Sequence, residues 1–381
     1  MHPRLVVTIA GLLSPTLATL QDLAECDPID KDSVCPPDLG FATKTAFDFA
    51  NSGWDDSFDA FWSVDNQTVK DKRQLDFDAD QGGVGIAVFE PGQTPTLTSK
   101  KYLLFGKVSA EIRGAAGNGV IAALVLKSDS GDEIDWEILG AHDKQAQTNY
   151  FYDGKALYNT YNTTYDLDFP VHDDFHKYAV EWTETKIVFS VDGKVVKTWY
   201  VGDIPSGSWP QTPMQVKLGT WAVTEDSDAG EVSWAGGVPD WDGGAPFTAY
   251  FRKVEVQDYA GWCAEVDGDV KYSYDERMGG WQDIKIGGCA KKMSPGMYTP
   301  HVPIQVGPTG TSSQQSDTGS PSTGDASATA TGTGTDAEPS ATDGDEAPPQ
   351  ESEDEDDSSV IQRRTSLLLV TIVLISWLTV L

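Results

Sequence analysis

The sequence predicts an all-β protein that folds as a two-sheet sandwich. From about residue 40 to 290, short segments rich in apolar residues alternate with turn residues, and no long stretch keeps the 3.6-residue period of a helix. One hairpin is clear, because Asp192-Gly193 separates the strands at 187–191 and 194–200. About 250 residues of this kind suffice for one large domain with its strands packed around one core.

The other expected strands support this class in chain order: 47–49, 84–89, 103–112, 120–127, 131–140 and 178–182. In the segment 131–140, Glu133, Asp135 and Glu137 alternate with apolar residues, so the three carboxyl groups share one face of the strand. Like charges this close cannot all be ionised, so at least one group should keep its proton near neutral pH. An exposed acidic edge strand is the alternative, but the apolar opposite face favours a strand packed on a core.

The spacing of these carboxylates suits a retaining glycosidase. The Cα atoms of Glu133 and Glu137 are about 13 Å apart along an extended strand. Side chains that lean together would approach the ~5–5.5 Å between the carboxyl groups of retaining enzymes, whereas the wider gap of inverting enzymes is harder to reach. Asp135 lies between the two and is placed to hydrogen-bond the nucleophile.

The run Asp-Glu-Ile-Asp-Trp-Glu-Ile-Leu-Gly at 132–140 resembles the Glu-x-Asp-x-Glu signature of glycoside hydrolase family 16. The resemblance implies a concanavalin-like jelly-roll β-sandwich with a concave substrate cleft. It also implies that Glu133 is the nucleophile, Asp135 the assisting carboxylate and Glu137 the general acid/base.

The order of later segments narrows the resemblance. Trp221-Ala222, an acidic loop at 225–228 and Trp234-Ala-Gly-Gly are similar to those of the fungal Crh-type cell-wall transglycosylases. This implies a retaining enzyme that cleaves β-1,4-linked chitin and transfers it to β-glucan (1,3 or 1,6) or chitin, cross-linking the cell wall. An endo-β-glucanase or chitinase is the alternative enzyme. A non-catalytic glycan-binding protein, the second alternative, would have no reason to keep the three carboxylates together.

Several residues are expected to bind the sugar chain. Gln147 and Asn149 share one face of a strand, and their segment resembles the Gln-Thr-Asn of the xyloglucan enzymes of this family. Lys217 and Trp221 share a face in the same way, and Trp234 is a second aromatic platform. Flat aromatic rings with a polar rim suit the apolar faces of sugars. The alternative is that the two tryptophans fill the core.

The remaining candidate groups are interpreted as structural. The histidines His172 and His176 are expected to support the fold, because the carboxylates already supply an acid and a base. Trp241 is the exception, as a weaker candidate for a sugar platform. The histidines are scattered and no Cys-x-x-Cys occurs, so neither a metal site nor a cofactor is expected. A net charge of −32 excludes nucleic acid as a partner.

The N-terminus predicts secretion. Residues 1–20 read as a signal peptide with Arg4, an apolar run and cleavage after Ala18 or shortly beyond. Asn66 and Asn162 head sequons compatible with N-glycosylation.

Secretion also predicts that the four cysteines form disulfides. In an oxidising compartment, Cys26–Cys35 and Cys263–Cys289 are the favoured disulfides among three possible pairings.

The C-terminal part predicts a stalk and a lipid anchor. Residues 21–300 form the expected catalytic domain, which should be a monomer, and 301–359 form a disordered stalk rich in Ser, Thr, Pro and acidic residues. Small residues at 357–359 are followed by a polar spacer at 360–366 and an apolar tail at 367–381. This order matches a glycosylphosphatidylinositol (GPI) attachment signal, with Ser358 as the attachment site and 360–381 as the segment that is removed. The protein is therefore expected outside the cell, at the cell wall or plasma membrane. A retained tail anchor is the alternative.

Overall fold

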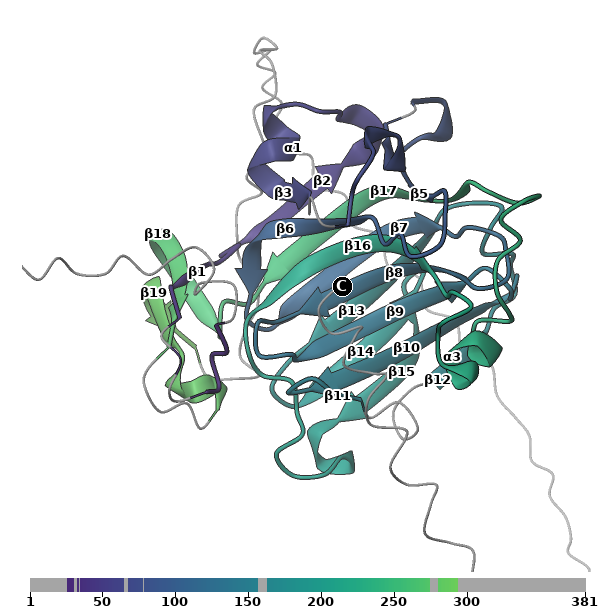
Figure 1. The fold of residues 1–381 in the computed structure, drawn as a ribbon. Helices are drawn as coiled ribbons and strands as arrows, with labels where there is room; N and C mark the ends of the chain where they lie inside the picture. Colours follow the sequence, from purple (N-terminus) through teal and green to yellow (C-terminus); the bar gives the residue numbers. More distant parts are fainter. Residues whose placement is uncertain are drawn as a thin grey trace, which may run out of the picture. The chain divides into compact units, whose positions relative to one another are not determined.

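The structure is a computed structural model, and it describes residues 26–30, 33, 35–64, 68–77, 79–156, 163–274 and 280–293. The described residues belong to one compact unit. They form two eight-stranded antiparallel sheets that pack face to face (Figure 1), which confirms the predicted sandwich. The expectations outside the described residues concern the signal peptide at 1–20, the sequon residues Asn66 and Asn162, the stalk at 301–359, and the anchor signal with Ser358.

The first sheet contains the strand with the three carboxylates. Its strand order is β11 (Lys155–Ala156), β10 (Gln145–Tyr152), β9 (Glu133–Leu139), β8 (Val120–Lys127), β16 (Met214–Ala222), β6 (Thr96–Leu103) and β3 (Trp62–Val64), while β12 (Thr163–Asp166) pairs with β10. β9 therefore lies inside the sheet between β8 and β10, and the acidic edge strand considered above does not apply.

The second sheet packs behind the first (Figure 1). Its order is β15 (Lys194–Tyr200), β14 (Lys186–Val191), β13 (His176–Trp182), β7 (Gly106–Arg113), β17 (Phe247–Asp258), β5 (Val84–Val88) and β4 (Leu75–Asp76), while β2 (Lys44–Asp48) pairs with β17. A separate small sheet contains β1 (Asp38–Leu39), β18 (Cys263–Ser273) and β19 (Lys285–Lys292).

Short helices connect these strands. The described helices are α1 (Asp56–Phe61) and α3 (Ala229–Trp234), with single 3-10 turns at η1 (Phe49–Asn51), η2 (Lys72–Gln74), η3 (Ala79–Gln81), η4 (Val201–Asp203) and η5 (Trp281–Asp283). Neither α-helix exceeds six residues, so none in the described part is long and apolar enough to cross a membrane.

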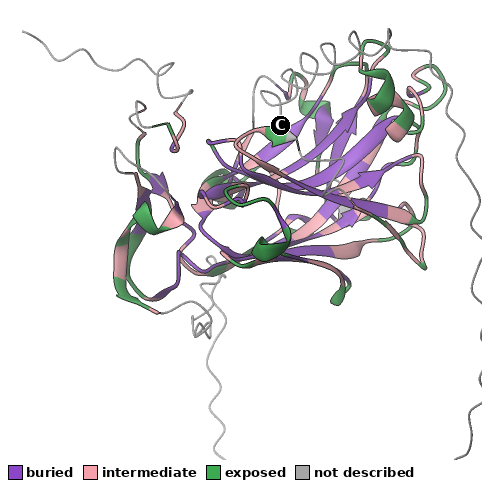
Figure 2. Cartoon of the chain, turned by 90° about the horizontal axis from the view of Figure 1, so that it is seen from below, coloured by how far each residue is buried: buried purple, intermediate pink, exposed green. Residues whose placement is uncertain are grey.

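The core lies between the two large sheets, whose strands are mostly buried (Figure 2). Ile134, Trp136 and Ile138 point into it from β9 and are fully buried, as their alternation predicts. The indole N–H of Trp136 donates to the carbonyl of Ala179 on the second sheet at 3.1 Å. Because this buried donor has a partner, the tryptophan ties the two sheets together without leaving a polar group unsatisfied.

Two local predictions have different outcomes. The Asp192-Gly193 hairpin is confirmed, since both residues adopt positive φ angles of 49° and 80°, as a type I′ turn requires. The single strand expected at 103–112 is wrong, because a turn at Leu104-Phe105 separates β6 from β7. Both turn residues are fully buried, so the turn has the apolar composition of a strand interior.

The disulfides join Cys26 to Cys35 and Cys263 to Cys289, the pairing that the sequence favours. The second bond links β18 to β19 within the small sheet.

Candidate active site

The candidate site is built on the outward face of the first sheet. Directly paired residues on neighbouring strands have side chains on the same face, so the register shows which side chains lie around each carboxylate. The three rows that cross β9 are Phe151–Glu133–Lys127–Gln215–Tyr102, Asn149–Asp135–Val125–Lys217–Thr98 and Gln147–Glu137–Ala123–Gly219–Thr96. Successive rows are about 7 Å apart along the strands. We call this surface the carboxylate face.

Glu133 forms an ion pair with Lys127, its direct partner on β8. Both side chains are about nine-tenths buried, with exposures of 10% and 9%. Buried charges are tolerated only when they are paired, so Lys127 supplies the charge that balances a carboxylate at this position. The sequence analysis missed this residue. The available signal was one lysine that ends an otherwise apolar strand, next to the acidic motif.

Asp135 lies in the middle of the three and is only 3% exposed. Burial raises the pKa of its carboxyl group well above the usual range, and the charges of Glu133 and Glu137 raise it further. Its side chain is hydrogen-bonded to that of Glu133. The raised pKa favours the protonated form of Asp135, whose carboxyl group can donate this hydrogen bond to the carboxylate of Glu133.

Glu137 is half-buried at the far end of the motif. Burial first, and then the charges of Glu133 and Glu231, raise its pKa to about 8. Glu137 is therefore protonated at neutral pH and has a proton to donate, while Glu133 has a cation beside it. The two ends of the motif therefore differ, with a carboxyl group paired to a cation at Glu133 and one with a raised pKa at Glu137.

The two amides predicted on β10 lie beside the carboxylates. Gln147 is opposite Glu137, and Asn149 is opposite Asp135. Both side chains are mostly buried, with 7% exposure each. The side-chain oxygen of Gln147 accepts a hydrogen bond of 2.7 Å from the indole N–H of Trp234. That bond fixes the amide with its NH₂ group still available as a donor beside Glu137.

Trp221 and Trp234, the two predicted sugar platforms, differ in burial. Trp221 and Trp234 stack with their ring centroids 6.0 Å apart and an interplanar angle of 24°. Trp221 is only 3% exposed and packs in a small apolar cluster, so it does not present the open ring face expected of a platform. This burial favours the alternative interpretation of Trp221 as a packing residue, and its expected role in sugar binding stays a prediction. Trp234 is half-buried and lies on α3 above this cluster.

The other predicted residues lie further from the motif. Lys217 is half-buried in the row of Asp135, two strands away, at a backbone distance of about 10 Å. Burial raises the pKa of Asp129, and the charge of Lys217 offsets part of that rise. Trp241 packs edge-to-face on Phe247, with centroids 5.5 Å apart, and lies outside the three rows of the carboxylate face.

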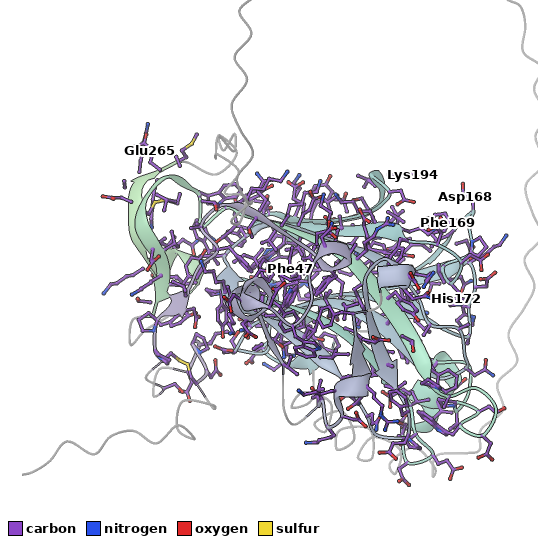
Figure 3. All side chains as sticks on the ribbon, turned by 90° about the horizontal axis from the view of Figure 1, so that it is seen from above. Phe47, Asp168, Phe169, His172, Lys194 and Glu265 are labelled. Carbon is purple, nitrogen blue, oxygen red and sulfur yellow. A yellow bond between two sulfur atoms is a disulfide. The ribbon has the colours of Figure 1, made fainter. Side chains whose placement is uncertain are left out.

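The histidines have structural surroundings. His176 lies on β13 of the second sheet, where its Nδ1 is 2.7 Å from Asp192 and its ring stacks on Phe169 at 3.5 Å. Burial lowers the pKa of His172. In the view of Figure 3, Phe169 and His172 lie at the end of the sandwich opposite Glu265 of the small sheet. Within the described residues, no three His, Cys, Asp or Glu side chains are grouped as metal ligands.

Comparisons with known proteins agree with this geometry. The family described as glycosyl hydrolases family 16 matches residues 54–236. Crh-like protein 5 of Aspergillus fumigatus is 35% identical over 276 residues, which cover 71% of this chain and 64% of that protein. Crh-like protein 4 of Botryotinia fuckeliana is 34% identical over 292 residues, which cover 76% of this chain and 71% of that protein.

A solved structure described as "Crh5 transglycosylase in complex with NAG" is also similar, with 32% identity and a TM-score of 0.58. The match covers 68% of this chain and 99% of that one. The chain spans 64% of the length of Crh-like protein 5 and 59% of the length of Crh-like protein 4 of Aspergillus fumigatus.

Proposed function

Because this chain belongs to glycosyl hydrolases family 16, we propose that it is an extracellular retaining transglycosylase that cleaves β-1,4-linked chitin. It would transfer the cleaved chain to β-glucan (1,3 or 1,6) or chitin acceptors and so cross-link the fungal cell wall. The observation that carries the proposal is the division of roles on β9. Glu133 is paired with Lys127, whereas the pKa of Glu137 is about 8.

The first step breaks the glycosidic bond. Glu137 donates its proton to the glycosidic oxygen while a carboxylate oxygen of Glu133 attacks the anomeric carbon. The leaving sugar departs with a new hydroxyl group, and the donor chain stays bound to Glu133 through an ester bond. The electron pair of the broken C–O bond is taken by the protonated oxygen, so Glu137 is left as a carboxylate.

The second step forms the product. Glu137, now ionised, takes the proton of an acceptor hydroxyl group, and the acceptor oxygen attacks the anomeric carbon. Glu133 leaves as a carboxylate, with Lys127 and the proton of Asp135 beside it to stabilise the returning charge. Two successive inversions at the same carbon give net retention. Water in place of the acceptor would give hydrolysis instead.

The position of Glu137 identifies the acceptor side. The acid/base residue touches the leaving oxygen and later the acceptor hydroxyl, so side chains beside it line the acceptor position. Gln147 and Trp234 lie there, and their hydrogen bond joins a polar group to an aromatic ring. Asn149 and Lys217 flank the middle of the carboxylate face as donors for sugar hydroxyls. Trp221 supports Trp234 from below.

The choice of substrate rests on the relatives. The Crh5 transglycosylase was solved with NAG, the sugar unit of chitin, and the chain covers nearly all of that protein. A plain endo-β-glucanase or chitinase would use the same carboxylates and remains the competing enzyme. A non-catalytic glycan-binding protein is disfavoured, because it would gain nothing from holding a buried proton on Asp135 and another on Glu137.

The proposal extends to the parts of the chain outside the described residues. A signal peptide at 1–20 would direct secretion, and Asn66 and Asn162 would carry N-linked glycans. The stalk at 301–359 would separate the catalytic domain, 21–300, from a GPI lipid attached at Ser358 after removal of the apolar tail. The monomeric enzyme would then act on polysaccharides at the plasma membrane or in the wall.

The mechanism can be tested by trapping the glycosyl-enzyme. A Glu137→Gln variant is given a chitobioside with a dinitrophenyl leaving group, which departs without a proton, so the first step proceeds and the second is slow. Mass spectrometry of peptides should locate the sugar on Glu133. The double variant with Glu133→Gln should form no adduct, and Glu265→Gln, an exposed residue of the small sheet, should turn over normally. An adduct on another residue would refute the assignment of Glu133.

A further inference from the structure

Helix α3 covers the end of the carboxylate face next to Glu137. Val232 and Trp234 of this helix pack against an apolar cluster that includes Leu139, Ile121 and Trp221. Those three residues form the next row across β9, β8 and β16, two residues beyond the row of Glu137. The helix therefore lies about one row, or 7 Å along the strand, from the acid/base residue.

Hydrogen bonds fix the helix in this position. Asp228 caps its N-terminus by accepting from the N–H of Gly230 at 2.8 Å. At its C-terminal end, the carbonyl of Ala235 accepts from the N–H of Gly119 at 2.8 Å, in the loop before β8. The indole of Trp234 bonds to Gln147, the direct partner of Glu137. The helix is thus tied to both strands that flank β9.

Glu231 is the acidic residue of this helix. It precedes Trp234 by three residues, so the two side chains are neighbours on one face of the helix. Glu231 is half-buried, and its carboxylate accepts a hydrogen bond from the side chain of Ser227, which holds it in place. The sequence analysis noted the acidic loop at 225–228 but assigned no role to Glu231.

We propose that Glu231 is a positioning residue of this active site, which keeps the proton on Glu137 until the leaving oxygen takes it. The inference rests on the proposed function, because it concerns the acid/base step of that reaction. Glu231 does not touch the reacting atoms in this account. It acts through the charge that it places beside Glu137.

The charges around Glu137 support this role. Glu133 and Asp135 lie on its own strand, where the raised pKa of Asp135 favours the neutral form. Lys127 on β8 is paired with Glu133, and Glu231 on α3 acts on Glu137 through its charge. Across the sheet its row continues through uncharged residues, Gln147 on one side and Ala123 with Gly219 on the other. Burial and the charge of Glu133 raise the pKa of Glu137, and the charge of Glu231 raises it further. The pKa of Glu231 is itself raised, mainly by burial and to a smaller extent by the charge of Asp228.

The consequence concerns both steps of the reaction. A higher pKa on Glu137 keeps the acid protonated over a wider pH range in the first step. It also makes the ionised Glu137 a stronger base toward the acceptor hydroxyl in the second step. The negative charge of Glu231 thus enlarges the protonated fraction of Glu137 available for the first step and strengthens its carboxylate as a base in the second.

The test is the pH dependence of turnover in a Glu231→Gln variant, which keeps the acceptor oxygen for Ser227 but removes the charge. The alkaline limb of kcat/KM should move to lower pH. If the midpoint falls by about half a pH unit from about 8, the ratio of rates at pH 8 and pH 6 falls about twofold. Glu231→Asp should restore most of the limb. Glu225→Gln, an exposed residue of the same loop, should leave the profile unchanged.

A second measurement does not depend on turnover. The ¹³C carboxyl resonance of Glu137, assigned by its loss in Glu137→Gln, should titrate at lower pH in Glu231→Gln than in the unaltered protein. An unchanged midpoint would overturn the inference, even if the enzyme proved active. Failure of the unaltered protein to process any β-glycan, with a shifted midpoint, would instead refute the proposed function and leave the role of Glu231 supported.

Discussion

At the scale of single residues, the three carboxyl groups of β9 differ because their neighbours differ. Lys127 faces Glu133, no cation among the described residues is paired with Glu137, and Asp135 is enclosed between two acids. Such an arrangement costs folding free energy, since two carboxyl groups must be held neutral in a buried place. The cost should be measurable through its dependence on pH.

We predict that Glu137→Gln stabilises the protein at alkaline pH. The folded-state pKa of Glu137 is about 8, against 4.5 for an ordinary glutamate, so the native state binds the proton more tightly than the unfolded state. Its contribution is fully favourable below pH 4.5 and is lost as the pH rises to 8. The variant should match the unaltered protein near pH 4 and exceed it by up to about 5 kcal/mol above pH 8.

The measurement is urea unfolding of both proteins across this pH range. Glu265→Gln is the control, since this carboxyl group is 65% exposed and paired only at the surface with Lys291 at 3.6 Å. A difference between Glu137→Gln and the unaltered protein that stays constant with pH would show that Glu137 is not strongly perturbed.

Much of the residue-scale prediction follows from the two-residue period of a strand. That period alone places Glu133, Asp135 and Glu137 together and sends Trp136 to the core. It does not reveal Lys127, because the pairing of two strands depends on a register that a single sequence leaves open. Glu231 was out of reach for a similar reason, as it approaches Glu137 only through the packing of α3.

At the scale of elements, the short helix α3 is one of the parts that the sequence did not predict. Its six residues are too few to show a helical period, and tertiary packing rather than propensity maintains such a helix. The stacked pair of Trp221 and Trp234 likewise depends on that packing. The helix packs Trp234 on the buried Trp221 and joins it by a hydrogen bond to Gln147, in the row of Glu137.

We predict that Trp234→Phe weakens acceptor use more than bond cleavage. The change keeps an aromatic ring but removes the N–H that holds Gln147, a hydrogen bond worth about 1 kcal/mol. The acceptor KM should rise about fivefold, while hydrolysis of the donor in the absence of an acceptor continues. Trp241→Phe is the matched control, because that indole packs on Phe247 away from the site. Equal loss of transfer and hydrolysis in Trp234→Phe would contradict an acceptor-side role.

At the scale of the whole molecule, the sandwich explains how one strand can carry this chemistry. β9 is inside the first sheet, so both of its edges are hydrogen-bonded and its inner face is packed on the second sheet. A rigid strand of this kind holds catalytic groups more exactly than a loop does. The fold class followed from the rhythm of strands and turns, whereas the turn at Leu104-Phe105 was hidden by its apolar composition.

The most direct test of the account is transfer by the secreted protein itself. Chitin oligomers and a fluorescent laminari-oligosaccharide are supplied together, and the products are sized by chromatography, with Glu133→Gln and Glu265→Gln in parallel. We expect fluorescent hybrid chains longer than the acceptor, lost in Glu133→Gln and retained in Glu265→Gln. Shortened chitin without any labelled hybrid would contradict transglycosylation to this acceptor and favour a hydrolase, and unchanged chitin would contradict the proposed donor.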